Sequence, residues 1–128
     1  KFQQWMPREE LLRKMASSDV FMFPGLRDGG GAVVVEAMSM GTPVVCLDIS
    51  GPGMHVTEQS GIKIAATSPE RSVEEMAAAL EGLYLDQRFR ENLGSGARER
   101  AELLYHWDRV GERMQEIYQQ IAVPDTAI

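Results

Sequence analysis

The sequence predicts an α/β domain built on a doubly wound parallel sheet, with a helical C-terminal tail. Short, continuously apolar runs such as residues 44–47 are typical of parallel strands that are covered on both faces. These runs alternate with segments whose apolar residues recur at helical spacing, and such alternation implies right-handed crossovers between parallel strands. The predicted strands are too few for a complete Rossmann sheet, so we expect further strands upstream of Lys1.

The first half of the chain is predicted to alternate between helix and strand. Pro7 suits a first helical position, and the apolar spacing after it predicts a helix over about 8–17. The apolar run at 19–23 predicts a buried strand. The segment from about 32–40 is compatible with a helix and ends where Gly41 offers a left-handed cap. The remaining elements of this half are a strand over 44–47, a turn or loop over 48–53 and a short strand over 61–65.

The second half is predicted to be helical. Residues 72–75 read Ser-Val-Glu-Glu, a capping box that marks the start of a helix. A second helix is predicted over about 86–104, with a weak point at 94–96, where the sequence reads Gly-Ser-Gly. A third helix over about 107–121 carries one apolar stripe, which we expect to pack against the sheet or against a missing domain. The stripe consists of Val110, Met114, Ile117, Tyr118 and Ile121, and residues 123–128 are expected to fray.

Length and composition favour a single globular domain over residues 1–128. The net charge of −6 and the pI of about 4.9 argue against a sequence-independent grip on nucleic acid or anionic lipid, because such binding needs a basic surface. No apolar run approaches the roughly 20 residues of a membrane-spanning helix, and no signal-peptide pattern is present, so we expect a cytoplasmic protein. Cys46 lies in an apolar run, where a buried thiol acts as a small hydrophobic group. The start at Lys1 rather than methionine is interpreted as a boundary inside a larger protein.

The most informative segment is the glycine-rich loop between the strand at 19–23 and the helix at 32–40. In an open parallel sheet, ligands gather outside the carboxyl ends of the strands, where a helix start offers free N–H groups and the positive end of its dipole. Gly29, Gly30 and Gly31 carry no Cβ, so a diphosphate can approach the backbone closely. The loop therefore indicates a phosphate site, and a flexible connection of the same composition is the open alternative.

Two carboxylates border this loop. Asp28 precedes the glycines, and Glu36 lies on the following helix among mostly apolar helical neighbours. A carboxylate accepts hydrogen bonds from the paired hydroxyls of a ribose or a hexose, so both residues are candidate sugar ligands. Pairing of Glu36 with Arg27 or Lys63 is the alternative, and the residues alone do not separate the two interpretations.

The order of residues around this loop resembles a known enzyme family. An apolar strand ends in proline, Asp28 and Glu36 keep the family's E-x7-E spacing, and residues 36–45 read Glu-Ala-Met-Ser-Met-Gly-Thr-Pro-Val-Val. This pattern is similar to that of the C-terminal domain of the retaining GT-B glycosyltransferases, often called family 4 or group 1. The resemblance covers nearly the whole chain and includes the Trp-Asp pair at 107–108 ahead of the last predicted helix.

The resemblance implies a donor site for a nucleotide sugar. Glu36 would take the ribose hydroxyls, and Asp28 would take the sugar-ring hydroxyls as the candidate catalytic residue. The implied reaction transfers a glycosyl group to an acceptor hydroxyl with retention of configuration and needs no metal or other cofactor. A missing N-terminal domain is the expected partner, so we expect this chain to be inactive alone. The implied diphosphate contacts are the backbone groups of Gly29, Gly30, Gly31 and Ala32 at the helix start.

Some residues depart from the family pattern. Asp28 replaces the usual first glutamate and is one methylene shorter, which leaves the donor's identity open. Met54 stands where a glutamate is common, and His55 after it is expected to be a loop residue rather than a catalyst. The arginine and lysine that bind the diphosphate in the family belong upstream of this chain, and neither Arg27 nor Lys63 can be given that role from the sequence.

Other functions fit the same fold class. A receiver-like or flavodoxin-like binding module shares the architecture, but a receiver needs an acidic pair, and none precedes Asp48. A noncatalytic Rossmann-like nucleotide-binding or regulatory module is the second alternative. Trp5 and Trp107 are expected to pack in the core rather than to stack on a base. Because a chain that lacks its neighbouring domain exposes apolar surface, any dimer of it is interpreted as an artefact.

Overall fold

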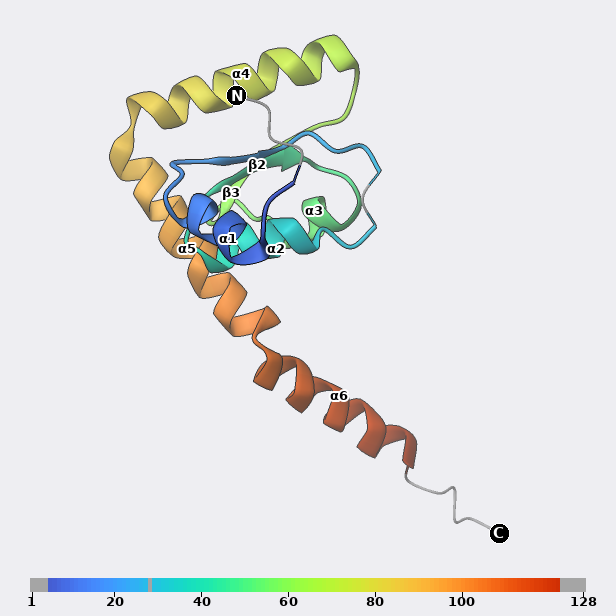
Figure 1. Ribbon diagram of the computed structural model, residues 1–128. Coiled ribbons are helices and arrows are strands. Elements are labelled where there is room, and N and C mark those ends of the chain that lie inside the picture. The colour runs from blue at the N-terminus through green and yellow to red at the C-terminus, as the bar shows by residue number, and fades with distance from the viewer. Residues whose placement is uncertain (1–4, 28, 123–128) are drawn as a thin grey trace.

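In the computed structural model, which describes residues 5–27 and 29–122, a three-stranded parallel sheet lies between two layers of helices (Figure 1). The strands β1 (Phe21–Phe23), β2 (Val44–Leu47) and β3 (Gly61–Ile64) lie side by side in chain order. Phe21 pairs with Val44, and Val44 with Gly61, so the carboxyl ends of the strands meet at one edge of the sheet. The predicted parallel α/β class with a helical tail is confirmed.

Different helices cover the two faces of the sheet. One face is covered by α1 (Arg8–Ala16), α2 (Ala32–Ser39) and part of α5 (Gln87–Tyr105). The other face is covered by α4 (Pro69–Leu85), which lies across the top of Figure 1. The predicted two-sided cover is complete for β2, whereas Met22 of β1 is 46% exposed, so the prediction of a buried strand at 19–23 was wrong in part.

β2 forms the centre of both cores. Val44 and Cys46 pack in the core beneath α2, and Val45 and Leu47 pack in the core beneath α4. Cys46 is fully buried, and burial raises the pKa of its thiol to about 11. A neutral, inaccessible thiol at this position confirms that Cys46 acts as a small hydrophobic core residue.

The helix α4 begins one turn earlier than predicted. Ser68 is its N-cap, and the Ser68 hydroxyl accepts a hydrogen bond of 3.2 Å from the Arg71 amide. Pro69 follows in the first turn, where proline's missing amide hydrogen is not needed. The prediction of a helix start at the 72–75 capping box was therefore wrong. Likewise, Pro7 precedes α1 as its N-cap instead of taking the first helical position.

The predicted turn or loop over 48–53 was wrong in part, because a short helix α3 (Ser50–His55) forms there. The sequence of this segment has turn composition, yet Pro52 falls in the first turn of the helix, where an amide has no intrahelical partner. Gly51 is buried against the glycine-rich loop. The helix therefore depends on a tertiary contact that local propensity does not reveal.

The Gly-Ser-Gly segment at 94–96 does not interrupt α5, so the predicted weak point was wrong. A Cβ on Gly94 would lie 2.5 Å from the carbonyl oxygen of Gly41. A Cβ on Gly96 would collide with the carbonyl oxygen of Gln59. These glycines therefore allow close packing of the helix on two loops. Gly41 itself has a φ of 77°, which confirms the predicted left-handed cap after α2.

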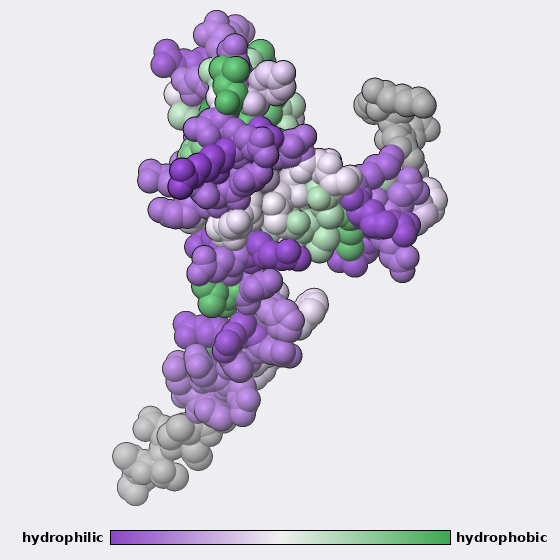
Figure 2. All heavy atoms as spheres, turned by 90° about the vertical axis from the view of Figure 1, so that its left-hand side faces the viewer, coloured by the Kyte–Doolittle hydropathy of each residue, from purple (hydrophilic) through white to green (hydrophobic). Residues whose placement is uncertain are grey.

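The last described helix, α6 (Trp107–Ala122), projects away from the sheet (Figure 1). The face that it shows in Figure 2 is mostly hydrophilic, and its apolar stripe remains exposed, with Tyr118 at 63% and Ile121 at 75% exposure. The stripe was expected to pack against the sheet or against a missing domain. Its exposure excludes the chain's own sheet as that partner. Trp5 and Trp107 are 79% and 84% exposed, so the prediction that they pack in the core was wrong. No helix within 5–27 or 29–122 is long and apolar enough to cross a membrane.

Candidate functional site

The glycine-rich loop lies at the carboxyl end of β1 and leads directly into α2. Gly31 is the N-cap of α2 and has a φ of 64°, in the left-handed region that only glycine adopts without strain. Gly29 and Gly30 are exposed, and so is Ala32, the first residue of the helix. Asp28, the predicted catalytic residue, lies outside the described residues, so its role remains a prediction.

This loop is packed against α3. A Cβ on Gly51 would lie 2.6 Å from the carbonyl carbon of Gly30 and 2.9 Å from the carbonyl oxygen of Gly29. A Cβ on Gly31 would lie 3.0 Å from the Pro52 ring and 3.1 Å from the imidazole of His55. The glycines therefore serve close backbone packing in addition to the turn itself. This packing weakens the alternative of a merely flexible connection.

His55 was expected to be a loop residue, but it ends α3 and its side chain reaches the glycine-rich loop. Its Nε2 lies 2.7 Å from the carbonyl oxygen of Gly30, and its Nδ1 lies 2.8 Å from the hydroxyl of Tyr105. The rings of His55 and Tyr105 meet edge to face at a centroid distance of 5.0 Å. Arg100 donates from Nε to the carbonyl oxygen of His55 at 2.7 Å, which fixes the end of α3 on α5.

Glu36 lies on α2 and pairs with Arg8, the first residue of α1. Arg8 donates to Glu36 Oε1 from Nη2 at 2.8 Å and from Nε at 3.1 Å. Among the described residues, Glu36 forms an ion pair with neither Arg27 nor Lys63, and Lys63 Nζ instead lies 2.9 Å from Asp48 Oδ1. The Arg8 side chain is 71% exposed, and such pairs contribute only about 0–1 kcal/mol to stability. A ligand can therefore displace this contact at low cost.

One groove of about 500 Å³ brings Gly30, Ala32 and Glu36 together, three of the six predicted site residues. Its lining includes Glu36 and the start of α2, together with residues from α1, α3 and α5 that the sequence analysis had not assigned to the site. Acidic, basic and aromatic groups therefore surround the exposed end of the glycine-rich loop. Its lining residues include Arg8, Gly30, Ala32, Glu36, His55, Tyr105 and Trp107.

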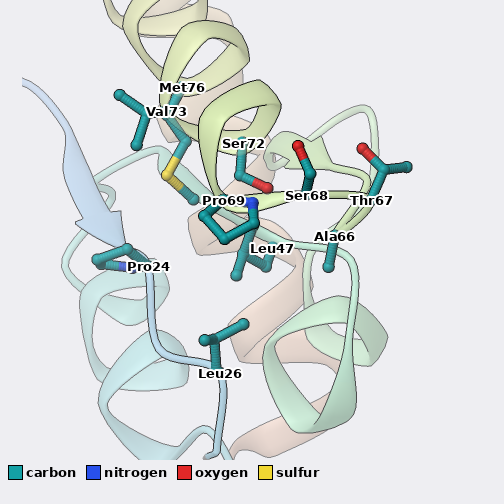
Figure 3. Close-up of a pocket in the computed structure, with 10 residues that line it drawn as sticks. All are labelled: Pro24, Leu26, Leu47, Ala66, Thr67, Ser68, Pro69, Ser72, Val73 and Met76. Carbon is teal, nitrogen blue, oxygen red and sulfur yellow. The ribbon is translucent and has the colours of Figure 1, made fainter.

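A second cavity of about 290 Å³ lies at the carboxyl ends of the strands, beside the start of α4 (Figure 3). Leu26, Leu47, Val73 and Met76 give it a mostly apolar surface. Among its described lining residues, the polar side chains carry only hydroxyl groups and none is charged. A diphosphate needs cationic groups or a cluster of N–H donors, so this cavity fits such a ligand less well than the groove beside Glu36.

Comparisons with known proteins identify the family of the chain. Residues 1–100 match the family described as Glycosyl transferases group 1. The chain is 30% identical to the D-inositol 3-phosphate glycosyltransferase of Corynebacterium diphtheriae, over 99% of this chain and 29% of that relative. The chain thus spans less than a third of that relative's length.

Solved structures show the same fold. Sucrose-phosphate synthase from Thermosynechococcus elongatus superposes with a TM-score of 0.80 at 25% identity, over 94% of this chain and 30% of that one. Anabaena HepE, solved in complex with UDP, superposes with a TM-score of 0.69 at 20% identity, over 84% of this chain and 29% of that one. Together with the match over residues 1–100, these findings establish that the chain belongs to the group 1 glycosyltransferase family.

Proposed function

We propose that this chain forms the donor site of a retaining glycosyltransferase and binds a nucleotide diphosphate sugar in the groove beside Glu36. The observation that carries the proposal is that one groove contains Glu36, the exposed Gly30 backbone and the first residue of α2. Glu36 suits the ribose hydroxyls of such a ligand, and the exposed backbone at Gly30 and at the start of α2 suits its diphosphate. Asp28, beside the same loop in sequence, is proposed to contact the sugar.

The start of α2 suits the diphosphate. The first turn of α2 contains no acidic residue, so nothing there opposes an anion. Among the described residues, the amides of Ala32 and Val33 have no hydrogen-bond acceptor, while the amides of Val34 and Val35 donate to Gly31. Two amide donors at the positive end of a helix dipole are suited to phosphate oxygens.

Glu36 suits a ribose. Both donors of Arg8 contact the same oxygen, Oε1, and within the described ranges Oε2 receives no hydrogen bond. A charged carboxylate with an open oxygen can accept from two neighbouring hydroxyls at once. Arg8 lies in the same groove, where its cation would meet the nucleotide. The solved relative from Anabaena holds UDP, which supports a nucleotide as the ligand class.

The proposed whole enzyme is longer than this chain. Because the chain spans 29% of its relative from Corynebacterium, we propose that an N-terminal domain supplies the acceptor site and that the chain alone does not catalyse transfer. We further propose that donor binding needs no metal, since amides and cations would neutralise the diphosphate. The family resemblance is what supports retention of configuration and a cytoplasmic location. A noncatalytic nucleotide-binding module is the competing function, and glycosyl transfer by the whole protein would exclude it.

The test is nucleotide binding by the protein at its full natural length and, in parallel, by the 128-residue chain. UDP, GDP and ADP and their glucose conjugates would be titrated by calorimetry, with and without a chelator. We expect the nucleotides of one base to bind, with or without the chelator. Glu36→Ala should weaken this binding by about 1–3 kcal/mol, the usual loss for a charge-assisted hydrogen bond. Glu74→Ala, an exposed change on α4, is the matched control and should bind as the wild type does. No binding by the full-length protein at millimolar ligand would overturn the proposal.

A further inference from the structure

His55 connects two helices to the glycine-rich loop. Its backbone carbonyl is held by Arg100, its Nδ1 by Tyr105, and its Nε2 contacts the carbonyl oxygen of Gly30. Arg100 and Tyr105 both belong to α5, which packs on α2 and on the sheet. The residue is thus held at three points, two of them on the imidazole ring.

The geometry determines which imidazole nitrogen carries the proton. A carbonyl oxygen can only accept a hydrogen bond, so Nε2 must be the donor to Gly30. In the neutral ring Nδ1 is then the acceptor, and the hydroxyl of Tyr105 donates to it. The three groups form one directed chain of hydrogen bonds, from Tyr105 through His55 to Gly30.

This chain of bonds sets the orientation of the Gly30–Gly31 peptide. The peptide is planar and trans, so its N–H points away from its C=O. Holding the Gly30 carbonyl oxygen on His55 therefore directs the Gly31 amide to the opposite side of the loop. Glycine residues place little restraint of their own on φ and ψ, so the orientation of this peptide depends on such an external contact.

We propose that His55 is a positioning residue for the diphosphate. It fixes the glycine-rich loop in the conformation that presents the start of α2 to phosphate oxygens, and Tyr105 holds the imidazole in the required tautomer. This inference rests on the proposed donor site and adds a residue to it. His55 acts through the backbone of Gly30 and needs no contact with the reacting atoms.

Three variants separate this role from a general contribution to folding. His55→Phe keeps a ring against Tyr105 but cannot donate to Gly30. His55→Gln places an amide N–H where Nε2 lies and restores the donor. Tyr105→Phe keeps the edge-to-face contact and removes only the hydroxyl that fixes the tautomer.

The experiment compares ligands with and without the diphosphate. UDP, GDP and ADP, and the nucleosides uridine, guanosine and adenosine, would be titrated into the full-length protein by ligand-observed NMR. We expect His55→Phe to weaken binding of the preferred nucleoside diphosphate about tenfold, as for the loss of one ordered hydrogen bond. Binding of the corresponding nucleoside should stay almost unchanged. His55→Gln should recover most of the loss, and Tyr105→Phe should show a smaller loss of the same selectivity. Equal diphosphate binding by His55→Phe, or an equal loss for nucleoside and diphosphate, would overturn the proposal.

A second measurement does not depend on the variants folding or on any nucleotide. Nitrogen-15 labelling of the histidines reports which imidazole nitrogen of wild-type His55 carries the proton. We expect Nε2–H with an unprotonated Nδ1, and the opposite tautomer would refute the assignment. If the wild type shows this tautomer but binds no nucleotide, the proposed donor-site function is wrong, while the hydrogen bond from His55 to Gly30 is supported.

Discussion

On one side of the groove lies the glycine-rich loop, which is packed on α3 through Gly51 and hydrogen-bonded to His55. On the other side lies Glu36, which is held by a single, largely exposed arginine. The first side consists of backbone in close contact with backbone, and it cannot move without disturbing α3. The second consists of side chains that can change partner at low cost. The difference favours a proposed diphosphate site that is formed in advance and a proposed ribose site that adjusts when the ligand binds.

The largest effect is expected where the loop meets α3. Gly51→Ala places a Cβ 2.6 Å from the carbonyl carbon of Gly30, and backbone on both sides must then move. Such overpacking costs typically about 1–3 kcal/mol, so we expect a corresponding loss in the free energy of unfolding and a loss of nucleotide binding. Urea denaturation measures the first effect. Gly82→Ala on α4 is the control, because nothing lies within 4 Å of its added Cβ, and it should be neutral or stabilising.

A smaller, more selective effect is expected within the loop. Gly31→Ala forces alanine to a φ of 64°, which costs roughly 1–2 kcal/mol of stability. Gly30→Ala meets no atom of the described residues within 4 Å, so stability should change by less than about 0.5 kcal/mol. Because Gly30 lines the groove, we expect the added methyl group to hinder the diphosphate and its binding to fall about tenfold. Thermal unfolding and calorimetry on the two variants would separate stability from binding, and unimpaired binding by Gly30→Ala would place the diphosphate elsewhere.

The two sides also differ in how far the sequence predicted them. The strands and the helix start at Ala32 were predictable, because apolar runs, glycines and proline act through local backbone preferences. α3 was missed, since its Ser-Gly-Pro-Gly start has the composition of a turn and its helix depends on contact with Gly30.

Contacts between distant residues were not predictable. Arg8 and Glu36 are 28 positions apart, and His55 and Tyr105 are 50 apart, so no periodicity within one segment links them. The apolar stripe of α6 was clear in the sequence, but the exposure of Tyr118 and Ile121 on it was not. Local patterns thus predicted the loop of the proposed ligand site, while the residues that hold this loop required the tertiary structure.

The smallest effect is expected from Arg8→Ala. An exposed ion pair contributes about 0–1 kcal/mol, so stability should barely change, and added salt should remove whatever difference exists. If Glu36 exchanges Arg8 for ribose hydroxyls, removing Arg8 also removes the competing partner. Binding of a nucleoside should then be unchanged or slightly tighter, while binding of the charged diphosphate weakens by no more than a few-fold. A large loss of nucleoside affinity in Arg8→Ala would show instead that Arg8 and Glu36 act as one preformed unit. The Arg8–Glu36 side of the groove would then be fixed in advance, like the glycine-rich loop.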